Sequence, residues 1–265
     1  MVEIKKLTID EFKDLASKLP FNEMLLTKDY HLTLVLYLLK GIEGIYFKGG
    51  TALQKIFLNY PRLSEDIDLT LTKDVKEVIK EIKRVLEKNG FKRITKDKDV
   101  EGFTRLVIHY NGFSDEEGVV FIDLNKRAKI LMNPEKHKIN HFYKGKIPEF
   151  SFNTLAKEEM IAEKVAAAIG RNQPRDHYDL YRIIKERIPI NLGLVKKKCT
   201  NTNIEFNLIK MFNKAKTLKN RWDEDLTPLL AEQVSFQEVI RILADYFNLK
   251  EEKKKRNRKP IVRGF

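Results

Sequence analysis

The sequence contains very little cysteine, because Cys199 is the only one among its 265 residues. A disulfide needs two cysteines, so we expect neither a disulfide within the chain nor a metal site built from cysteines. This usage excludes the small disulfide-stapled scaffolds of secreted proteins and fits the reducing cytoplasm.

Long hydrophobic runs are also missing. The longest apolar stretch, Leu32–Leu39, is interrupted by Thr33, and it is far shorter than the roughly 20 residues that a membrane-spanning helix needs. Residues Met1–Asp10 lack the apolar segment of a signal peptide. We therefore expect a cytoplasmic protein with no membrane partner.

Charge is abundant and mostly positive. Hydrophobic residues make up 42% of the chain and charged residues 34%, which permits a core and argues against global disorder. The formal net charge is +13, and the last 16 residues hold eight Lys/Arg against two Glu, so the rest of the chain carries +7. A basic body favours a polyanionic partner such as RNA or DNA. Solubility alone is the alternative explanation.

Apolar periodicity predicts an α+β fold in which a mixed α/β part precedes a helical part. Strand-like runs cover residues 44–47, 66–71, 91–95, 103–110 and 119–124, among helical patterns at 9–19, 23–39, 51–59 and 75–88. Only helical patterns follow, at 154–169, 175–187, 204–218 and 236–247. We expect an α/β domain over residues 1–150, a helical domain over 151–249 and a basic, mobile tail over 250–265, with the boundary in the Pro- and Gly-containing connection 133–152.

Two adjacent glycines, Gly49 and Gly50, lie between a short apolar strand and a helix. Glycine has no Cβ, so backbone N–H groups at this turn can approach a bulky anion. The helix that follows adds its unpaired first-turn N–H groups, and Thr51 adds a hydroxyl at the cap. A phosphate fits this arrangement. The alternative is a tight strand-to-helix turn that merely needs glycine.

Asp66 and Asp68 lie two residues apart in a run of alternating polar and apolar residues. On a strand both carboxylates project from one face, while Ile67 and Leu69 point into the core. Neighbouring carboxylates repel each other unless a cation or a proton intervenes. Mg²⁺ prefers such oxygens together with water and substrate phosphates. The alternative is an edge strand with two solvated acids.

A phosphate-binding turn followed by an Asp-x-Asp strand is the layout of the polymerase-β-like nucleotidyltransferases. Such enzymes usually take a third metal-binding carboxylate from a neighbouring strand, and Asp123 is the natural candidate. It is a lone acid in the β-branched and aromatic run Val119–Leu124, where an unpaired charge is costly. The alternative is a strand-end acid at the surface.

Lys164 lies on an alanine-rich helical segment, and its point charge can reach a triphosphate. Asp176 precedes another helical segment, where an N-cap is the simpler role, and Asp179 follows three residues later. Lys164 and Asp179 are 15 residues apart, so their side chains can meet if the two helices are antiparallel.

Four motifs in this order, KGGTAL, RLSEDIDL, EKVAA and RDHYDLY, resemble the AbiEii-type nucleotidyltransferase toxins, which include the MenT-like enzymes of type IV toxin–antitoxin and phage-defence systems. The resemblance runs over residues 44–181. It implies a minimal nucleotidyltransferase domain followed by a helical domain, with the active site in the cleft between them. It also implies Mg²⁺ (or Mn²⁺), an NTP substrate, the 3′ end of tRNA as an acceptor and a cognate antitoxin protein as a partner.

The resemblance assigns Gly49, Gly50 and Thr51 to the phosphate-binding motif, with Thr51 replacing the usual serine and keeping its hydroxyl. Arg62 and Ser64 match positions that flank the acidic pair and serve nucleotide binding.

The same resemblance assigns the charged residues. Asp66 and Asp68 match the metal-binding pair. Lys164 matches a lysine that contacts the nucleotide, and Asp179 matches the acid of the last motif, with Asp176 the less favoured choice.

These assignments predict an enzyme that moves a nucleoside monophosphate from an NTP onto an acceptor, with an RNA 3′ end favoured, as the toxin of a toxin–antitoxin or phage-defence system. Two alternatives stay open. One is a catalytically silent RNA- or DNA-binding protein that keeps the fold, and the other is nucleotidyl transfer to a protein hydroxyl.

Overall fold

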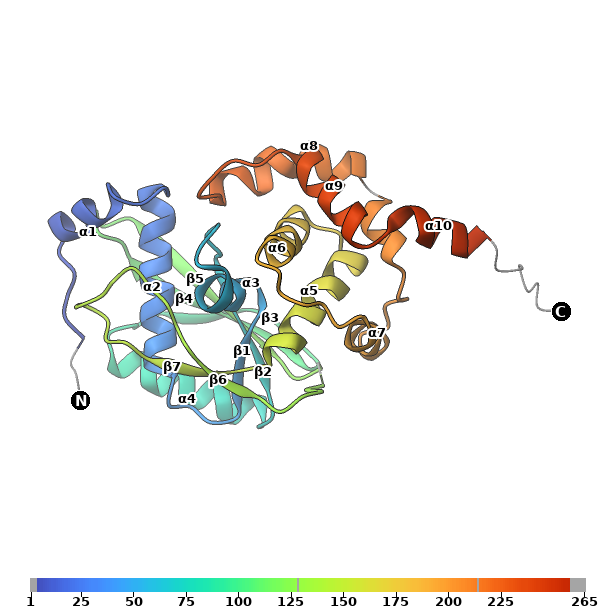
Figure 1. Ribbon diagram of the computed structural model, residues 1–265. Helices are drawn as coiled ribbons and strands as arrows, with labels where there is room; N and C mark the ends of the chain where they lie inside the picture. Colours follow the sequence, from blue (N-terminus) through green and yellow to red (C-terminus); the bar gives the residue numbers. More distant parts are fainter. Residues whose placement is uncertain (1–3, 128, 214, 258–265) are drawn as a thin grey trace. The chain divides into compact units, whose positions relative to one another are not determined.

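The computed structural model describes residues 4–127, 129–213 and 215–257 (Figure 1). The chain divides into two compact units. The first unit comprises Met1–Met160 with Leu229–Glu232, and the second comprises Ile161–Pro228 with Gln233–Phe265.

The first unit is built on a seven-stranded mixed sheet with the strand order β3-β4-β5-β2-β1-β7-β6. Strands β2 and β5 pair in parallel, as do β1 and β7, and the other neighbours are antiparallel. The expected α+β class with a mixed sheet is confirmed. The strands are β1 Ile45–Lys48, β2 Asp66–Leu71, β3 Ile94–Val100, β4 Phe103–Asn111, β5 Glu117–Asn125, β6 Glu135–Lys138 and β7 Ser151–Thr154.

Helices cover this sheet and supply much of its core. Helix α2 (Glu23–Leu39) packs on β2, on β5 and on α4 (Val75–Lys88). Leu32 and Leu36 of α2 are fully buried, as are Ile82 and Leu86 of α4. Burying each of these side chains stabilises the fold by about 1.5–3 kcal/mol. The short helix α1 (Ile9–Ala16) packs against α2.

The helix expected over residues 51–59 is present but irregular. It begins as α3 (Gly49–Leu53) and continues as a π-helical turn over Gln54–Leu58. Lys55 in this turn is buried, and its Nζ lies 2.6 Å from Oδ1 of Asp29 on α2 and 3.0 Å from the hydroxyl of Tyr60. A buried charge is tolerated only when it is paired, so this ion pair fixes the segment after the glycine turn to α2.

The connection expected over residues 133–152 contributes two strands to the sheet. Strand β6 pairs with β7, and β7 pairs with β1 at Phe47 and Thr154. The sheet therefore continues beyond residue 150, where the first domain was expected to end. The sequence of β6, Glu-Lys-His-Lys, has no alternation of apolar and polar residues because it forms an edge of the sheet with its side chains largely exposed.

Among its described residues, the second unit contains helices joined by turns and loops, and no strand. The prediction of one helix over residues 204–218 is wrong, because Leu208–Phe212 is a 3₁₀ turn and α8 begins only at Ala215. Residues 250–257 of the expected mobile tail belong to α10, and residues 258–265 lie outside the described residues. Within the described residues no helix is long and apolar enough to cross a membrane. The helices are α5 Lys157–Gly170, which begins in the first unit, α6 Pro174–Lys185, α7 Leu192–Asn201, α8 Ala215–Asp225, α9 Phe236–Tyr246 and α10 Leu249–Asn257.

Candidate active site

The turn after β1 brings Gly49 against the carboxylate of Asp68. Gly49 has a positive φ of 81°, and a Cβ built on it would lie 2.0 Å from Oδ2 of Asp68. No side chain fits at that distance, and the left-handed backbone itself favours glycine. Glycine is needed here because it lets the backbone approach the acid, so two residues singled out from the sequence lie together.

Gly50 lies against two further candidates. A Cβ on Gly50 would lie 2.9 Å from Nη2 of Arg62 and 3.2 Å from Oγ of Ser64. Arg62 is only 1% exposed, and its Nη1 donates a hydrogen bond of 2.8 Å to the carbonyl of Leu63. The glycine pair thus contacts both the strand that carries Asp66 and Asp68 and the loop that leads into it.

A segment remote in sequence holds that loop in place. The N–H of Leu63 donates to the carbonyl of Leu229 at 2.8 Å, and the N–H of Ala231 donates to the carbonyl of Pro61 at 3.0 Å. Arg62 faces Leu230 in the resulting antiparallel bridge. The main chain of residues 61–63 is therefore fixed on both sides of Arg62.

Thr51 has a different place from the one expected. Its side chain is buried, and its hydroxyl donates a hydrogen bond to the carbonyl of Asp66. The hydroxyl proton therefore ties α3 to the start of β2. In this arrangement it is committed to a main-chain carbonyl instead of being free to cap the helix or to donate to a phosphate.

Four adjacent strands, β1, β2, β5 and β4, place four charged residues in one row. Lys48 on β1 lies opposite Asp68 on β2, Asp68 lies opposite Asp123 on β5, and Asp123 lies opposite Arg105 on β4. Side chains of directly opposed residues share a face of the sheet, and neighbouring strands are about 4.8 Å apart. The row reads cation, acid, acid, cation, so each acid has a positive neighbour.

The bond between Arg105 and Asp123 is bidentate. Nε of Arg105 donates to Oδ1 of Asp123 at 2.7 Å, and Nη2 donates to Oδ2 at 2.8 Å. These hydrogen bonds raise the pKa of the Arg105 guanidinium above its ordinary value. Asp123 is thus beside Asp68, as expected, but its carboxylate is held by an arginine, and its role as a third metal ligand stays a prediction.

The acidic pair has the chemistry that a divalent cation requires. Asp66 and Asp68 alternate on β2 and remain half-exposed, while Ile67 between them is buried. Hard carboxylate oxygens on one face suit Mg²⁺ completed by water and phosphate oxygens. Within the described residues no group of three or more His, Cys, Asp or Glu side chains is arranged to hold a metal ion. The fit therefore rests on these two acids.

Sequence reasoning missed Lys48 and Arg105. Arg105 is the only Lys or Arg in the apolar run 103–110, which is the same signal that singled out Asp123. Lys48 directly precedes the glycine pair and is largely buried. Their proximity to the acids follows from strand register, which no local pattern reveals.

The second unit brings its three candidates together. Nζ of Lys164 lies 2.9 Å from Oδ2 of Asp179 and 3.1 Å from Oδ1 of Asp176, and all three side chains are buried. Arg171 adds two hydrogen bonds of 2.8 Å to Asp176. Burial by itself raises the pKa of Asp176, but the charges of Lys164 and Arg171 outweigh burial and hold that pKa well below its ordinary value.

This cluster confirms that the helices carrying Lys164 and Asp179 bring the two side chains into contact. Its geometry explains how Lys164 is held in one orientation, because both of its acidic partners are themselves fixed on α6. The roles in nucleotide binding that the resemblance assigns to Lys164, Asp176 and Asp179 stay predictions.

Comparison with known proteins gives a family match. The family model described as "Nucleotidyl transferase AbiEii toxin, Type IV TA system" matches residues 38–242, which is more than half of the chain. No curated protein sequence matches that of this chain.

Solved structures share the fold. JHP933 from Helicobacter pylori superposes with a TM-score of 0.57 at 17% identity, covering 89% of this chain and 97% of its own. MenT4, a nucleotidyltransferase toxin from Mycobacterium tuberculosis, gives a TM-score of 0.60 at 19% identity, covering 91% of this chain and 99% of its own. At these identities the likeness establishes the fold.

Proposed function

This chain belongs to the AbiEii family of nucleotidyl transferase toxins of type IV toxin–antitoxin systems, and we propose that it transfers a nucleoside monophosphate from an NTP to the 3′ end of an RNA, tRNA in particular. The observation that carries the proposal is the contact between the Gly49 backbone and the Asp68 carboxylate. It places a surface free of side chains, suited to phosphates, beside an acid suited to the cation that accompanies them.

Different residues of the first unit would serve different steps of such a reaction. Asp66 and Asp68 would hold Mg²⁺ (or Mn²⁺), which supplies positive charge at the phosphates. The backbone of Gly49 and Gly50 would receive the terminal phosphates, and Lys48 would add charge from the end of β1. The acceptor hydroxyl would attack the α-phosphate in line, forming the new phosphodiester and releasing pyrophosphate. Positioning and electrostatics then account for most of the rate.

The proposed RNA acceptor has an electrostatic basis. The chain carries a net charge of +13 in spite of its acidic centre. Basic side chains attract RNA by releasing its counterions, and they offset the repulsion that Asp66 and Asp68 exert on its phosphates. We place the reaction in the cytoplasm, with an antitoxin protein as the partner that restrains it.

The test is transfer itself. The protein is incubated with each labelled NTP in turn, Mg²⁺ and total tRNA, and the products are separated. We expect labelled RNA from at least one nucleotide, lost in the Asp66→Ala variant and retained in the Asp10→Ala variant, whose exposed acid lies on α1. Labelled protein instead of RNA would redirect the acceptor assignment. No label in either product, from protein shown to be folded, would contradict the proposal.

A further inference from the structure

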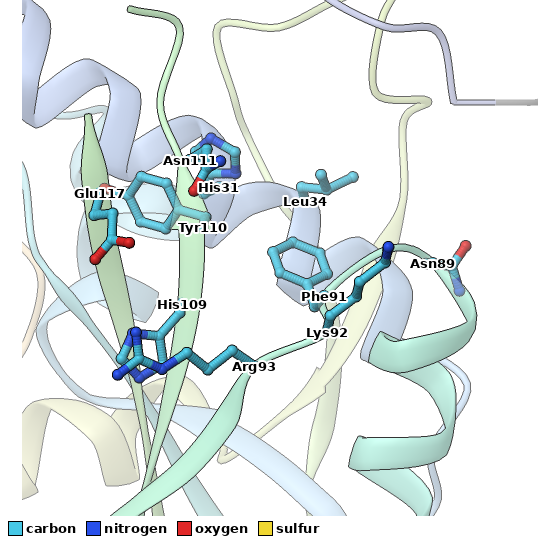
Figure 2. Close-up of a pocket in the computed structure, with 11 residues that line it drawn as sticks. His31, Leu34, Asn89, Phe91, Lys92, Arg93, His109, Tyr110, Asn111 and Glu117 are labelled. Atoms are coloured by element: carbon cyan, nitrogen blue, oxygen red, sulfur yellow. The ribbon is translucent and has the colours of Figure 1, made fainter. Parts of the chain in front are cut away.

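A pocket lies in the first unit at the end of β4, away from the acidic row. It encloses about 440 Å³ and is lined by α2, by the connection from α4 to β3, and by β4 and β5 (Figure 2). A volume of this size is typical of small-molecule sites. Its lining includes His31, Phe91, Lys92, Arg93, Tyr110 and Asn111.

One wall of the pocket is aromatic. The rings of His31 and Tyr110 stack with centroids 4.0 Å apart and an interplanar angle of 14°, and Phe91 meets His31 edge-on. Gly118 on β5 makes room for this wall, because a Cβ there would lie 2.3 Å from the Tyr110 ring. Such flat surfaces accept any nucleobase by stacking.

His31 also has unused hydrogen-bonding capacity. Its Nδ1 is buried and has no hydrogen-bond partner in the part of the chain that the structure describes. Burial lowers the pKa of His31 to about 4, so the ring is neutral near pH 7. A buried polar atom is costly when it is left without a partner, and pairing this nitrogen with a base edge requires the His31 ring to turn toward the pocket.

Positive charge borders the aromatic wall. Lys92 and Arg93 are adjacent and exposed in the connection just before β3, and both line the pocket. Asn111 adds an amide, and Glu117 is the acid on the same rim. The two cations suit a phosphate, while the amide and the carboxylate suit the donors of a base.

Strand β4 connects the pocket to the acidic row. Arg105 and His109 are both on β4 and, four residues apart, project from the same face of the sheet. At ~3.3 Å per residue the separation is about 13 Å. His109 lines the pocket, and its N–H donates to the carbonyl of Arg93. His109, on the pocket's rim, therefore lies on the face that carries the acids, whereas Tyr110 projects from the opposite face, so the pocket lies where the two faces meet at the end of β4.

We propose that this pocket binds one nucleotide of the RNA acceptor strand, with its base against Tyr110 and His31 and a phosphate at Lys92 and Arg93. The inference rests on the proposed function, since it places an upstream part of the RNA while the 3′ hydroxyl lies at Asp66 and Asp68. It assigns acceptor recognition to a site separate from the NTP.

Binding tests the pocket without catalysis. Affinities of the full chain are measured in EDTA, without NTP, for a single-stranded oligoribonucleotide, for each nucleoside monophosphate and for inorganic phosphate. The double variant Lys92→Ala/Arg93→Ala is compared with Arg84→Ala/Lys88→Ala, which removes the same charge from exposed positions of α4. We expect the pocket variant to bind the oligonucleotide about tenfold more weakly than its control, the scale of losing one stacked and neutralised nucleotide. An equal loss of affinity in the two double variants would show that only the overall charge of the protein matters, and it would overturn the proposal.

A substitution of His31 tests the aromatic wall. His31→Phe keeps an aromatic ring and removes Nδ1. It should therefore weaken binding of the oligonucleotide with little change in the melting temperature of the protein. Monophosphates that bind at this pocket without competing with the oligonucleotide would overturn the assignment to the acceptor strand.

Transfer kinetics separate this inference from the function beneath it. In an active enzyme, Lys92→Ala/Arg93→Ala should raise the KM for RNA and leave the KM for NTP and kcat unchanged. Pocket-dependent RNA binding in a protein that transfers nothing would leave the inference standing and remove the proposed function. Transfer kinetics that these variants leave unchanged would remove the inference and leave the proposed function standing.

Discussion

The carboxylate of Asp68 occupies the space that a side chain at position 49 would need, since a Cβ there would come within 2.0 Å of its Oδ2. Gly49 begins α3 directly after β1, and Asp68 lies on β2, whose antiparallel register with β1 sets Lys48 opposite Asp68. One contact therefore couples the turn that suits phosphates to the strand that suits a cation.

Substitution of Gly49 should remove activity for a reason beyond backbone strain. Gly49→Ala forces Cβ into Asp68 and a left-handed φ of 81° on alanine, whereas Gly145→Ala imposes the same strain at φ 80° with nothing within 4 Å. We expect each variant to lose about 1 kcal/mol or more of stability from strain. Only Gly49→Ala should lose nucleotidyl transfer. Equal transfer rates in the two variants would show that the contact does not matter.

Arg105 should tune the affinity for the metal. Its guanidinium binds both oxygens of Asp123, next to Asp68. Arg105→Gln removes a positive charge from the acidic row, so the Mg²⁺ concentration that gives half-maximal thermal stabilisation should fall on the order of fivefold at low salt. Arg84→Gln, on the exposed face of α4, serves as the control. An unchanged midpoint would mean that no cation binds near this row.

Much of the first unit could be predicted from the sequence, because its signals are local. The limits of α2, β2 and α4 agree with the apolar pattern and the turn residues around them. The spacing of Asp66 and Asp68 gave their common face, and the pattern of motifs gave the family, now confirmed by the match over residues 38–242.

The rest depended on information that local patterns do not hold. Arg105 reaches Asp123 only because β4 and β5 pair in one particular register. Strand β6 is recognisable only through its partner β7, since Glu135–Lys138 is polar throughout. Helix α7 carries three consecutive lysines, Lys196–Lys198, and Lys198 is itself buried beside Val195 and Cys199, so the buried face has no clear apolar pattern.

Lys164 should be needed for the stability of the second unit. It lies between the buried carboxylates of Asp176 and Asp179. Lys164→Met leaves those acids without this partner, and removing one member of a buried ion pair costs about 3–5 kcal/mol. Urea denaturation should show a loss of this size, with Lys164→Arg losing less because it keeps the charge. A Met variant as stable as the wild type would contradict the account of the cluster.

Asp176 should make stability depend on acid pH. Its pKa is lower in the folded chain than its ordinary value of 3.8, so the unfolded chain binds the proton first as the pH falls. The stabilisation is complete above the ordinary value and is lost as the pH falls from there through the lower folded value. The free energy of unfolding of the wild type should approach that of Asp176→Asn between pH 5 and pH 3. A constant difference over that range would contradict the pKa shift.

Manganese binding tests the central claim most directly, because Mn²⁺ replaces Mg²⁺ at carboxylate sites and its paramagnetic signal reports whether the ion is bound. The protein is titrated with Mn²⁺ in the presence of a non-hydrolysable NTP, and free ion is measured by electron paramagnetic resonance. The account predicts tight, NTP-dependent binding in the wild type and in Asp10→Asn, and its loss in Asp66→Asn and Asp68→Asn. The same binding in Asp68→Asn as in the wild type would contradict it.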